Sequence, residues 1–269
     1  EIGSGLVGSE MCIRDRNGYK ARKLRFNLTG YSRVNAYMLV PDGEGPFPAV
    51  VLLHDHGGHY TIGKEKMIRP FGVSPEVLAD ADAWAKQCYG GQYVGDYLAA
   101  HGYVVISIDA LFWGERGRKE GVDGDKHMAV AGNFMMLGRS WSAFMNYEDM
   151  YTTDFLATLP EVDSKRIGCM GFSMGAYRAW MLSALSDKVK AGAAVCWMVT
   201  TDCQFKAGNG RVGNSVLLSM DHDSVDIAFE YRALRRPEDR LCSRTKLQWV
   251  HRRENHCCTC QSFALHALQ

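Results

Sequence analysis

Two features are missing from the sequence, and each absence narrows the class of protein. No stretch of about 18 uninterrupted apolar residues occurs, so no membrane-spanning helix is expected. Neither sign of charge is in excess, because 31 Lys and Arg stand against 30 Asp and Glu for a net charge of +1. That balance argues against a nucleic-acid or membrane-surface partner. We expect one soluble globular domain that acts on a small, roughly neutral molecule, with its oligomeric state left open.

Glycine is absent after Gly213, although the chain holds 28 glycines. At the density of the first 213 residues, about seven would be expected in the remaining 56, because the turns of α/β folds need them. Arginine pairs and a cysteine cluster occur there instead, and no strand can be identified after Met220. We therefore expect a domain over residues 17–220, truncated at its C-terminal end, and an atypical, out-of-frame or foreign tail over residues 221–269.

The nine cysteines lack a regular framework, and their number is odd. Cys169 and Cys196 lie in apolar runs and are expected to be buried thiols. A cluster near the C-terminus consists of Cys257, Cys258 and Cys260 beside His256. Its spacing is tighter than the C-x-x-C of zinc knuckles, so no metal site is predicted there.

Residues 1–16 contain neither an apolar core nor a helix-capping pattern. They resemble translated library-adapter sequence of the kind found at the ends of environmental gene fragments, and we treat them as a non-native leader outside the fold. The true N-terminus and any signal peptide are then out of view. The compartment, cytoplasmic or secreted, therefore stays open.

Strand and helix patterns alternate along the rest of the chain, which is typical of a three-layer α/β fold. Expected strands are a half-exposed hairpin (residues 24–28 and 34–40) and the buried runs 49–54, 103–109, 166–172 and 189–199. Expected helical segments are residues 76–88, 92–101, 125–159 and 176–185. Residues 61–91, which contain the first of these helices, look like an insertion beside the mouth of the active site.

The pattern Gly171-Phe-Ser173-Met-Gly175 lies between an expected strand and an expected helix. This is the context of a nucleophile elbow, where glycines flank the serine because strand and helix backbones nearly touch. Ser173 is the predicted nucleophile. Its hydroxyl needs a histidine to take the proton. Because G-x-S-x-G is a short pattern that also arises by chance, the strand-to-helix context carries the prediction.

A histidine-glycine loop, His54-Asp-His56-Gly-Gly-His59, follows the buried run 49–54. In serine-elbow hydrolases this loop donates one N–H to the oxyanion of the tetrahedral intermediate, and the residue after the serine donates the other. The donors predicted here are His56 and Met174. Two alternatives remain: a plain polar turn, and a zinc site using His54, His56 and His59, whose spacing resembles the start of the H-x-H-x-D-H motif of metallo-β-lactamase-like hydrolases. Gly58 occupies the aspartate position of that motif, so no metal site is assigned.

Asp109 ends the strand over residues 103–109, at the edge of the sheet where functional groups gather. A hydrogen-bonding, structural role is expected for it, because the acid of an elbow hydrolase normally follows the serine in the chain.

Taken in order, the histidine loop, the inserted segment, Asp109, the loop over residues 113–117 and the elbow resemble the α/β-hydrolase superfamily. Within it, the likeness is to dienelactone-hydrolase-like and acetyl-xylan-esterase-like proteins, over about residues 23–220. The resemblance implies an α/β-hydrolase fold with a mostly parallel central sheet, and no cofactor. Dienelactone hydrolase itself has a cysteine nucleophile where this chain has Ser173, which favours ordinary ester hydrolysis.

The resemblance also implies a catalytic aspartate and a histidine near the C-terminus, and here the chain departs from the pattern. The later candidates are His222, Asp223, Asp226, Asp239, His251, His256 and His266, and none follows a recognisable strand. The catalytic acid and base are therefore left unassigned. The favoured function is a serine carboxylic-ester hydrolase acting on a small or carbohydrate-linked ester. The alternatives are a catalytically silent binding protein of the same fold and a zinc-dependent hydrolase.

Overall fold

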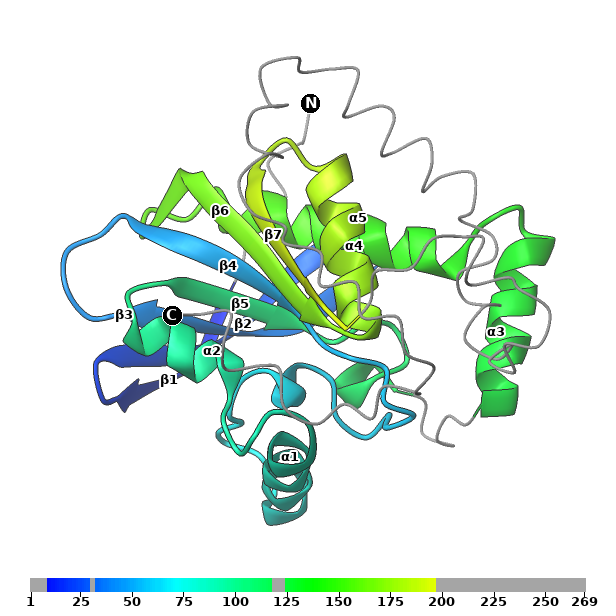
Figure 1. Ribbon diagram of the computed structural model, residues 1–269, viewed down its shortest axis with the longest axis horizontal. Coiled ribbons are helices and arrows are strands. Elements are labelled where there is room, and N and C mark those ends of the chain that lie inside the picture. The colour runs from blue at the N-terminus through cyan, green and yellow to red at the C-terminus, as the bar shows by residue number, and fades with distance from the viewer. Residues whose placement is uncertain (1–8, 30–31, 118–123, 197–269) are drawn as a thin grey trace, which may run out of the picture.

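The computed structural model describes residues 9–29, 32–117 and 124–196, and the described strands form a seven-stranded sheet in the order β1-β2-β3-β5-β4-β6-β7 (Figure 1). The strands are β1 (Ser9–Arg16), β2 (Tyr19–Thr29), β3 (Ser32–Pro41), β4 (Phe47–Leu53), β5 (Val104–Ile108), β6 (Val162–Phe172) and β7 (Val189–Val195). The sheet is mixed, because pairing is antiparallel from β1 to β5 and parallel from β5 through β4 and β6 to β7. The carboxyl ends of β4, β5 and β6 therefore meet at one edge, where functional groups of α/β sheets gather.

Helices cover both faces of the sheet, as the alternating pattern predicts (Figure 1). The α-helices are α1 (Pro75–Cys88), α2 (Val94–Ala100), α3 (Gly124–Met136), α4 (Trp141–Leu156) and α5 (Met174–Leu185), with the 3₁₀ turns η1 (Lys64–Lys66) and η2 (Gly114–Arg116). Apolar residues of α4 and α5 pack on one face, and those of α2 and of the segment after η1 pack on the other. Helix α3 contacts α4 and stands to one side of the sheet.

Strand β4 explains why the run over residues 49–54 is continuously apolar. Val51 and Leu53 pack in the core under α4 and α5, whereas Leu52 packs in the core under α2. Successive side chains of a strand point to opposite faces, so a strand covered on both faces needs apolar residues at every position. The expected fold class is confirmed.

Two expectations about the first strands are corrected. Part of the expected leader, Ser9–Arg16, forms β1 and pairs antiparallel with β2. Pairing of this kind uses main-chain groups and asks little of the side chains, which is why the sequence pattern did not reveal it. The second hairpin strand, β3, is also more buried than the half-exposed strand expected, because it pairs with β5 inside the sheet and carries residues of both cores.

Two further corrections concern the later elements. The single helical region expected over residues 125–159 is two helices, because Gly138 adopts a positive φ of 63° and Ser140 caps the next helix by accepting a hydrogen bond from the N–H of Ala143. Cys169 is buried as expected, but Cys196 is exposed. Cys196 follows β7, which is one of the two edge strands of the described sheet, so no described strand lies beyond it on that side.

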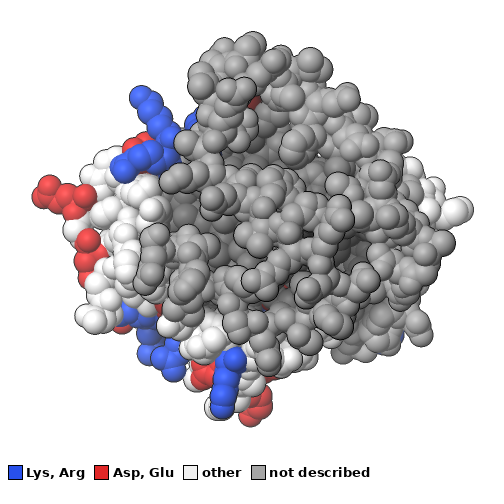
Figure 2. Space-filling view, in the orientation of Figure 1, with Lys and Arg blue, Asp and Glu red and all other residues white. Residues whose placement is uncertain are grey.

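None of the helices in the described part of the chain is both long and apolar enough to cross a membrane. Where described residues are visible in Figure 2, basic and acidic side chains lie next to one another rather than in separate fields. The end of the expected domain, residues 197–220, and the expected tail over residues 221–269 lie outside the described residues.

Candidate active site

Ser173 occupies a sharp bend between β6, which ends at Phe172, and α5, which begins at Met174. Its backbone angles are φ 55° and ψ −119°, a conformation that non-glycine residues rarely adopt. The Ser173 N–H donates to the Val195 carbonyl of β7 (2.9 Å), and its carbonyl accepts from Ala176 (2.8 Å) in the first turn of α5. The side chain makes no capping bond to α5 and is partly exposed, so its hydroxyl is not consumed by the helix.

Gly171 and Gly175 have no room for a side chain. A Cβ on Gly171 would lie 2.0 Å from the Gly175 carbonyl oxygen, and a Cβ on Gly175 would lie 1.9 Å from the Leu53 carbonyl oxygen. These are backbone atoms that cannot move aside without shifting β4 or the elbow. The glycines are therefore required by the close packing of the strand against the helix. This is the reason why the sequence motif predicts glycine at both positions.

The histidine-glycine loop leaves the end of β4 next to this bend. A Cβ on Gly175 would also lie 2.9 Å from the His54 carbonyl oxygen, so the first turn of α5 touches the beginning of the loop. His56 and Met174 are linked through Trp113: the His56 ring lies 5.0 Å from the Trp113 ring, and Met174 packs in the same buried cluster as Trp113. The structure thus brings together the elbow and the loop that the sequence singled out.

The N–H of Met174 belongs to the first turn of α5, where backbone N–H groups have no acceptor within their own helix. Such groups also lie at the positive end of the helix dipole. An anion beside Ser173 would accept hydrogen bonds from these N–H groups and be attracted to the positive end of the helix dipole. This is the electrostatic arrangement that an oxyanion requires.

His54, His56 and His59 each have their own partners instead of facing a common point. His54 is fully buried and accepts at Nε2 from the Ala110 N–H (2.9 Å), His56 accepts at Nδ1 from the Gly58 N–H (3.0 Å), and His59 contacts Asp80 through Nε2 (2.6 Å). Across the described residues, no three His, Cys, Asp or Glu side chains group in a way that could hold a metal ion.

Both inner histidines are held neutral. Burial, with the nearby Lys66 charge, lowers the pKa of His54 well below 6.5. The same two causes lower the pKa of His56 to about 4, although the Asp55 carboxylate opposes them. Neither imidazole therefore brings a positive charge to the loop near neutral pH.

A buried charged cluster beneath the loop was not predicted from the sequence. Lys64 and Lys66, both in η1, are fully buried, and so are their carboxylate partners Asp109 and Asp55. Two lysines separated by one glutamate in a glycine-containing loop normally indicate a solvated turn. Only the distant partners, up to 45 residues away in the chain, reveal that these two lysines are inside.

Asp109 is fully engaged in this cluster. Its Oδ1 accepts from the Lys64 N–H (2.7 Å), and its Oδ2 accepts from the Lys64 ammonium (2.8 Å) and the Glu115 N–H (3.2 Å). Burial raises the pKa of Asp109 to about 6, against the lowering effect of Lys64. The expected hydrogen-bonding role is confirmed, and the carboxylate ties η1 to the loop over residues 113–117.

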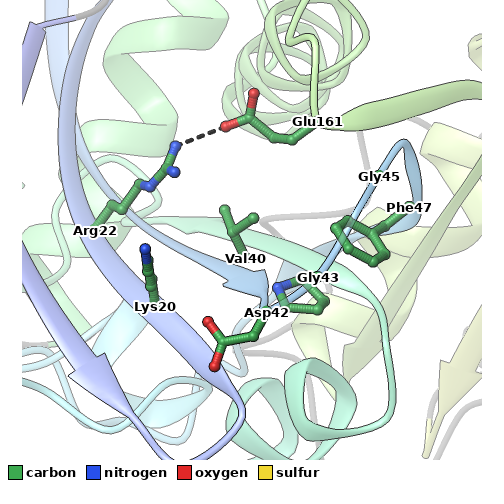
Figure 3. Close-up of a pocket in the computed structure, with 9 residues that line it drawn as sticks. Lys20, Arg22, Val40, Asp42, Gly43, Gly45, Phe47 and Glu161 are labelled. Atoms are coloured by element: carbon green, nitrogen blue, oxygen red, sulfur yellow. Dashed lines mark hydrogen bonds and ion pairs between the residues drawn. The ribbon is translucent and has the colours of Figure 1, made fainter.

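One cavity of about 220 Å³ opens at the opposite edge of the sheet (Figure 3). It is lined by Phe47 at the beginning of β4 and by Glu161 just before β6, whose far ends carry the histidine loop and Ser173. Arg22 points across it to Glu161 and forms an ion pair of 2.7 Å. This cavity is therefore not part of the candidate active site.

The candidates for the catalytic acid and base named from the sequence all follow residue 196 and lie outside the described residues. They are His222, Asp223, Asp226, Asp239, His251, His256 and His266. The cysteine cluster beside His256 lies there as well.

Residues 75–207 match the model of the dienelactone hydrolase family. The chain is 30% identical over 198 residues to a Bacillus subtilis (strain 168) protein named "Putative hydrolase YtaP", an alignment that covers 73% of this chain and 59% of that protein. The crystal structure of "a putative acetyl xylan esterase" from Bacteroides fragilis NCTC 9343 superposes with a TM-score of 0.56 at 22% identity, covering 68% of this chain and 46% of that one.

The superposition on the Bacteroides fragilis structure supports the fold, and the family model matches the segment that contains the elbow. The chain spans 59% of the length of the curated relative and 46% of the crystallised one. The matched segment contains the elbow but begins after the histidine loop.

Proposed function

We propose that this chain, an α/β-hydrolase with a dienelactone-hydrolase-family segment over residues 75–207, is a serine carboxylic-ester hydrolase in which Ser173 is the nucleophile. The observation that carries the proposal is the backbone of Ser173, held at φ 55° between a strand and a helix whose glycines leave no space for side chains. A strained residue is retained where the surrounding structure forces it, and such sites are often functional. Here the strain lifts one hydroxyl off the end of the sheet.

In the proposed reaction the Ser173 oxygen attacks the ester carbonyl carbon and its proton passes to a base. The carbonyl oxygen becomes an oxyanion, which accepts hydrogen bonds from the N–H groups of His56 and Met174. The alcohol leaves with a proton, and water then hydrolyses the acyl-enzyme and regenerates the serine. No cofactor takes part in these steps.

A small ester, including an ester attached to a carbohydrate, is the substrate class that we propose. The near-neutral charge of the chain supports an uncharged substrate over a polyanion. Acetylated sugars are suggested by the name of the similar Bacteroides fragilis protein, so they are included as one of several test substrates. Phenyl acetate and an acetylated xylo-oligosaccharide represent the two forms.

The test is ester hydrolysis by the full chain and by two serine variants. Ser173→Ala removes the proposed nucleophile, whereas Ser183→Ala removes a hydroxyl on the same helix that bonds to the Ala179 carbonyl (2.8 Å). We expect Ser173→Ala to abolish turnover and Ser183→Ala to retain it. Absence of turnover in folded wild-type chain would favour the catalytically silent binding protein instead.

A further inference from the structure

Lys66 makes unusual contacts for a buried lysine, because its ammonium binds main-chain oxygens on both sides of His56. Its Nζ lies 3.0 Å from the Asp55 carbonyl oxygen and 3.2 Å from the His56 carbonyl oxygen. The Asp55 carboxylate lies 3.4 Å away and supplies the opposite charge, and the Trp84 ring lies 5.0 Å from Nζ. The side chain is fully buried, so its hydrogen bonds go to protein groups.

The Asp55 carbonyl is held from two sides. The backbone N–H of Ala110 can only donate, so the Nε2 of His54 that it contacts is an acceptor and the proton of the neutral ring lies on Nδ1. That Nδ1–H then donates to the Asp55 carbonyl at 2.9 Å, beside the Lys66 ammonium. A carbonyl with both lone pairs occupied by buried donors cannot rotate without losing two hydrogen bonds.

The position of the Asp55 carbonyl decides where the next N–H points. Carbonyl and N–H of one trans peptide lie in a plane and point in opposite directions. Lys66 and His54 fix the Asp55 oxygen on the buried side of the loop, so the His56 N–H is turned away from them. On the other side of the residue, the His56 carbonyl is held by Lys66 and by the indole N–H of Trp113 (3.3 Å). Both peptide planes that flank His56 are thus fixed from beneath.

We propose that Lys66 is a positioning residue that fixes the direction of the His56 N–H as an oxyanion donor, an inference that rests on the proposed esterase function. Preorganised donors stabilise a transition state because they need no reorganisation when charge develops. If Lys66 only filled space or paired with Asp55, replacing it would lower stability but leave kcat and KM of the folded enzyme unchanged.

The test compares Lys66→Met with Lys64→Met in the full chain. Both lysines are fully buried in η1, but the Lys64 ammonium contacts the carboxylates of Glu65, Asp109 and Glu115 instead of loop carbonyls. Lys66→Met should lower kcat for phenyl acetate by about 10- to 100-fold with KM nearly unchanged, since loss of a whole donor costs about 100- to 1,000-fold. It should weaken inhibition by a trifluoromethyl ketone in the same proportion. Lys64→Met should keep kcat within about twofold of the wild type among folded molecules.

The reaction of Ser173 with a fluorophosphonate distinguishes the possible failures. Wild-type protein that reacts, together with Lys66→Met that reacts equally fast, would overturn the positioning role and leave the esterase proposal intact. Folded wild type that does not react would overturn both. If Lys66→Met does not fold, Trp113→Phe removes a second side-chain donor to the His56 carbonyl, which also accepts from the His59 N–H (3.2 Å). Its kcat should fall severalfold at constant KM, and an unchanged kcat would overturn the inference.

Discussion

Arg178 and Asp149 form a two-point ion pair inside the protein, with Nε to Oδ2 at 2.9 Å and Nη2 to Oδ1 at 2.6 Å. Arg178 belongs to α5, the helix that begins directly after Ser173, and Asp149 belongs to α4. Both side chains are buried, with exposures of 1% and 0%. The pair therefore links the helix of the elbow to its neighbour in the helical layer.

Asp149→Asn should destabilise the protein strongly, because it leaves the Arg178 charge buried without its counter-charge. Breaking such a pair from one side typically costs about 3–5 kcal/mol. Asp154→Asn is the matched control: Asp154 lies on the same helix and pairs with the more exposed Lys188. It should cost less than about 1 kcal/mol. Urea unfolding monitored by circular dichroism measures both, and equal losses would contradict the importance of the buried pair.

Gly175→Ala should prevent the elbow from forming, because the added methyl group would meet the Leu53 carbonyl oxygen at 1.9 Å. We expect a loss of at least about 3 kcal/mol or failure to fold. Gly132→Ala, in α3, meets no atom within 4 Å and should stabilise its helix by about 0.5–1 kcal/mol. Thermal melting of both variants is the measurement. A Gly175→Ala protein with wild-type stability would show that β4 and α5 are not packed as described.

His56 should make stability fall as the pH is lowered from 6.5 to 4. Burial first, and then the Lys66 charge, lowers its pKa in the folded protein from 6.5 to about 4, so across this window the unfolded chain binds a proton that the folded chain does not. Lowering the pH therefore favours unfolding. Burial of Asp109, whose pKa rises to about 6, acts in the opposite direction over an overlapping window.

The variant His56→Phe isolates this contribution, because it keeps a ring against Trp113 and Tyr60 and leaves Asp109 unchanged. Between pH 6.5 and pH 4, the unfolding free energy of the variant should fall less than that of the wild type. The difference between the two losses should be roughly 1–3 kcal/mol. Urea unfolding of both proteins at pH 6.5 and at pH 4 gives the change in unfolding free energy with pH for each. Identical pH dependence in the two proteins would mean that His56 does not titrate as described.

Local patterns predicted local structure well. The elbow could be identified because a strand, a glycine-flanked serine and a helix are adjacent in the chain, and α1 and α5 begin within two residues of the expected positions. Burial that depends on distant partners could not be identified. Lys66 looks like a surface residue until the fold places the Asp55 and His56 carbonyls beside it.

The pairing of β1 was missed for a related reason. An edge strand is selected by the unpaired main-chain groups of its neighbour, which leave little trace in the sequence. The catalytic acid and base stayed unassigned because no strand pattern precedes the later histidines and aspartates, and in α/β folds strand ends position such groups.

Metal removal should leave ester hydrolysis unchanged. His54, His56 and His59 are each bonded to a different group, so they do not share a metal in this arrangement. We expect the same initial rate on phenyl acetate before and after dialysis against EDTA, and no gain on adding Zn²⁺. Loss of turnover with EDTA that Zn²⁺ restores would support the zinc-dependent alternative.

The most direct measurement of the central claim is fluorophosphonate labelling of the full chain followed by peptide mapping. The account predicts a single labelled site, the peptide that contains Ser173, with labelling lost in Ser173→Ala and retained in Ser183→Ala. Folded protein that stays unlabelled, or that is labelled at another serine, would contradict it.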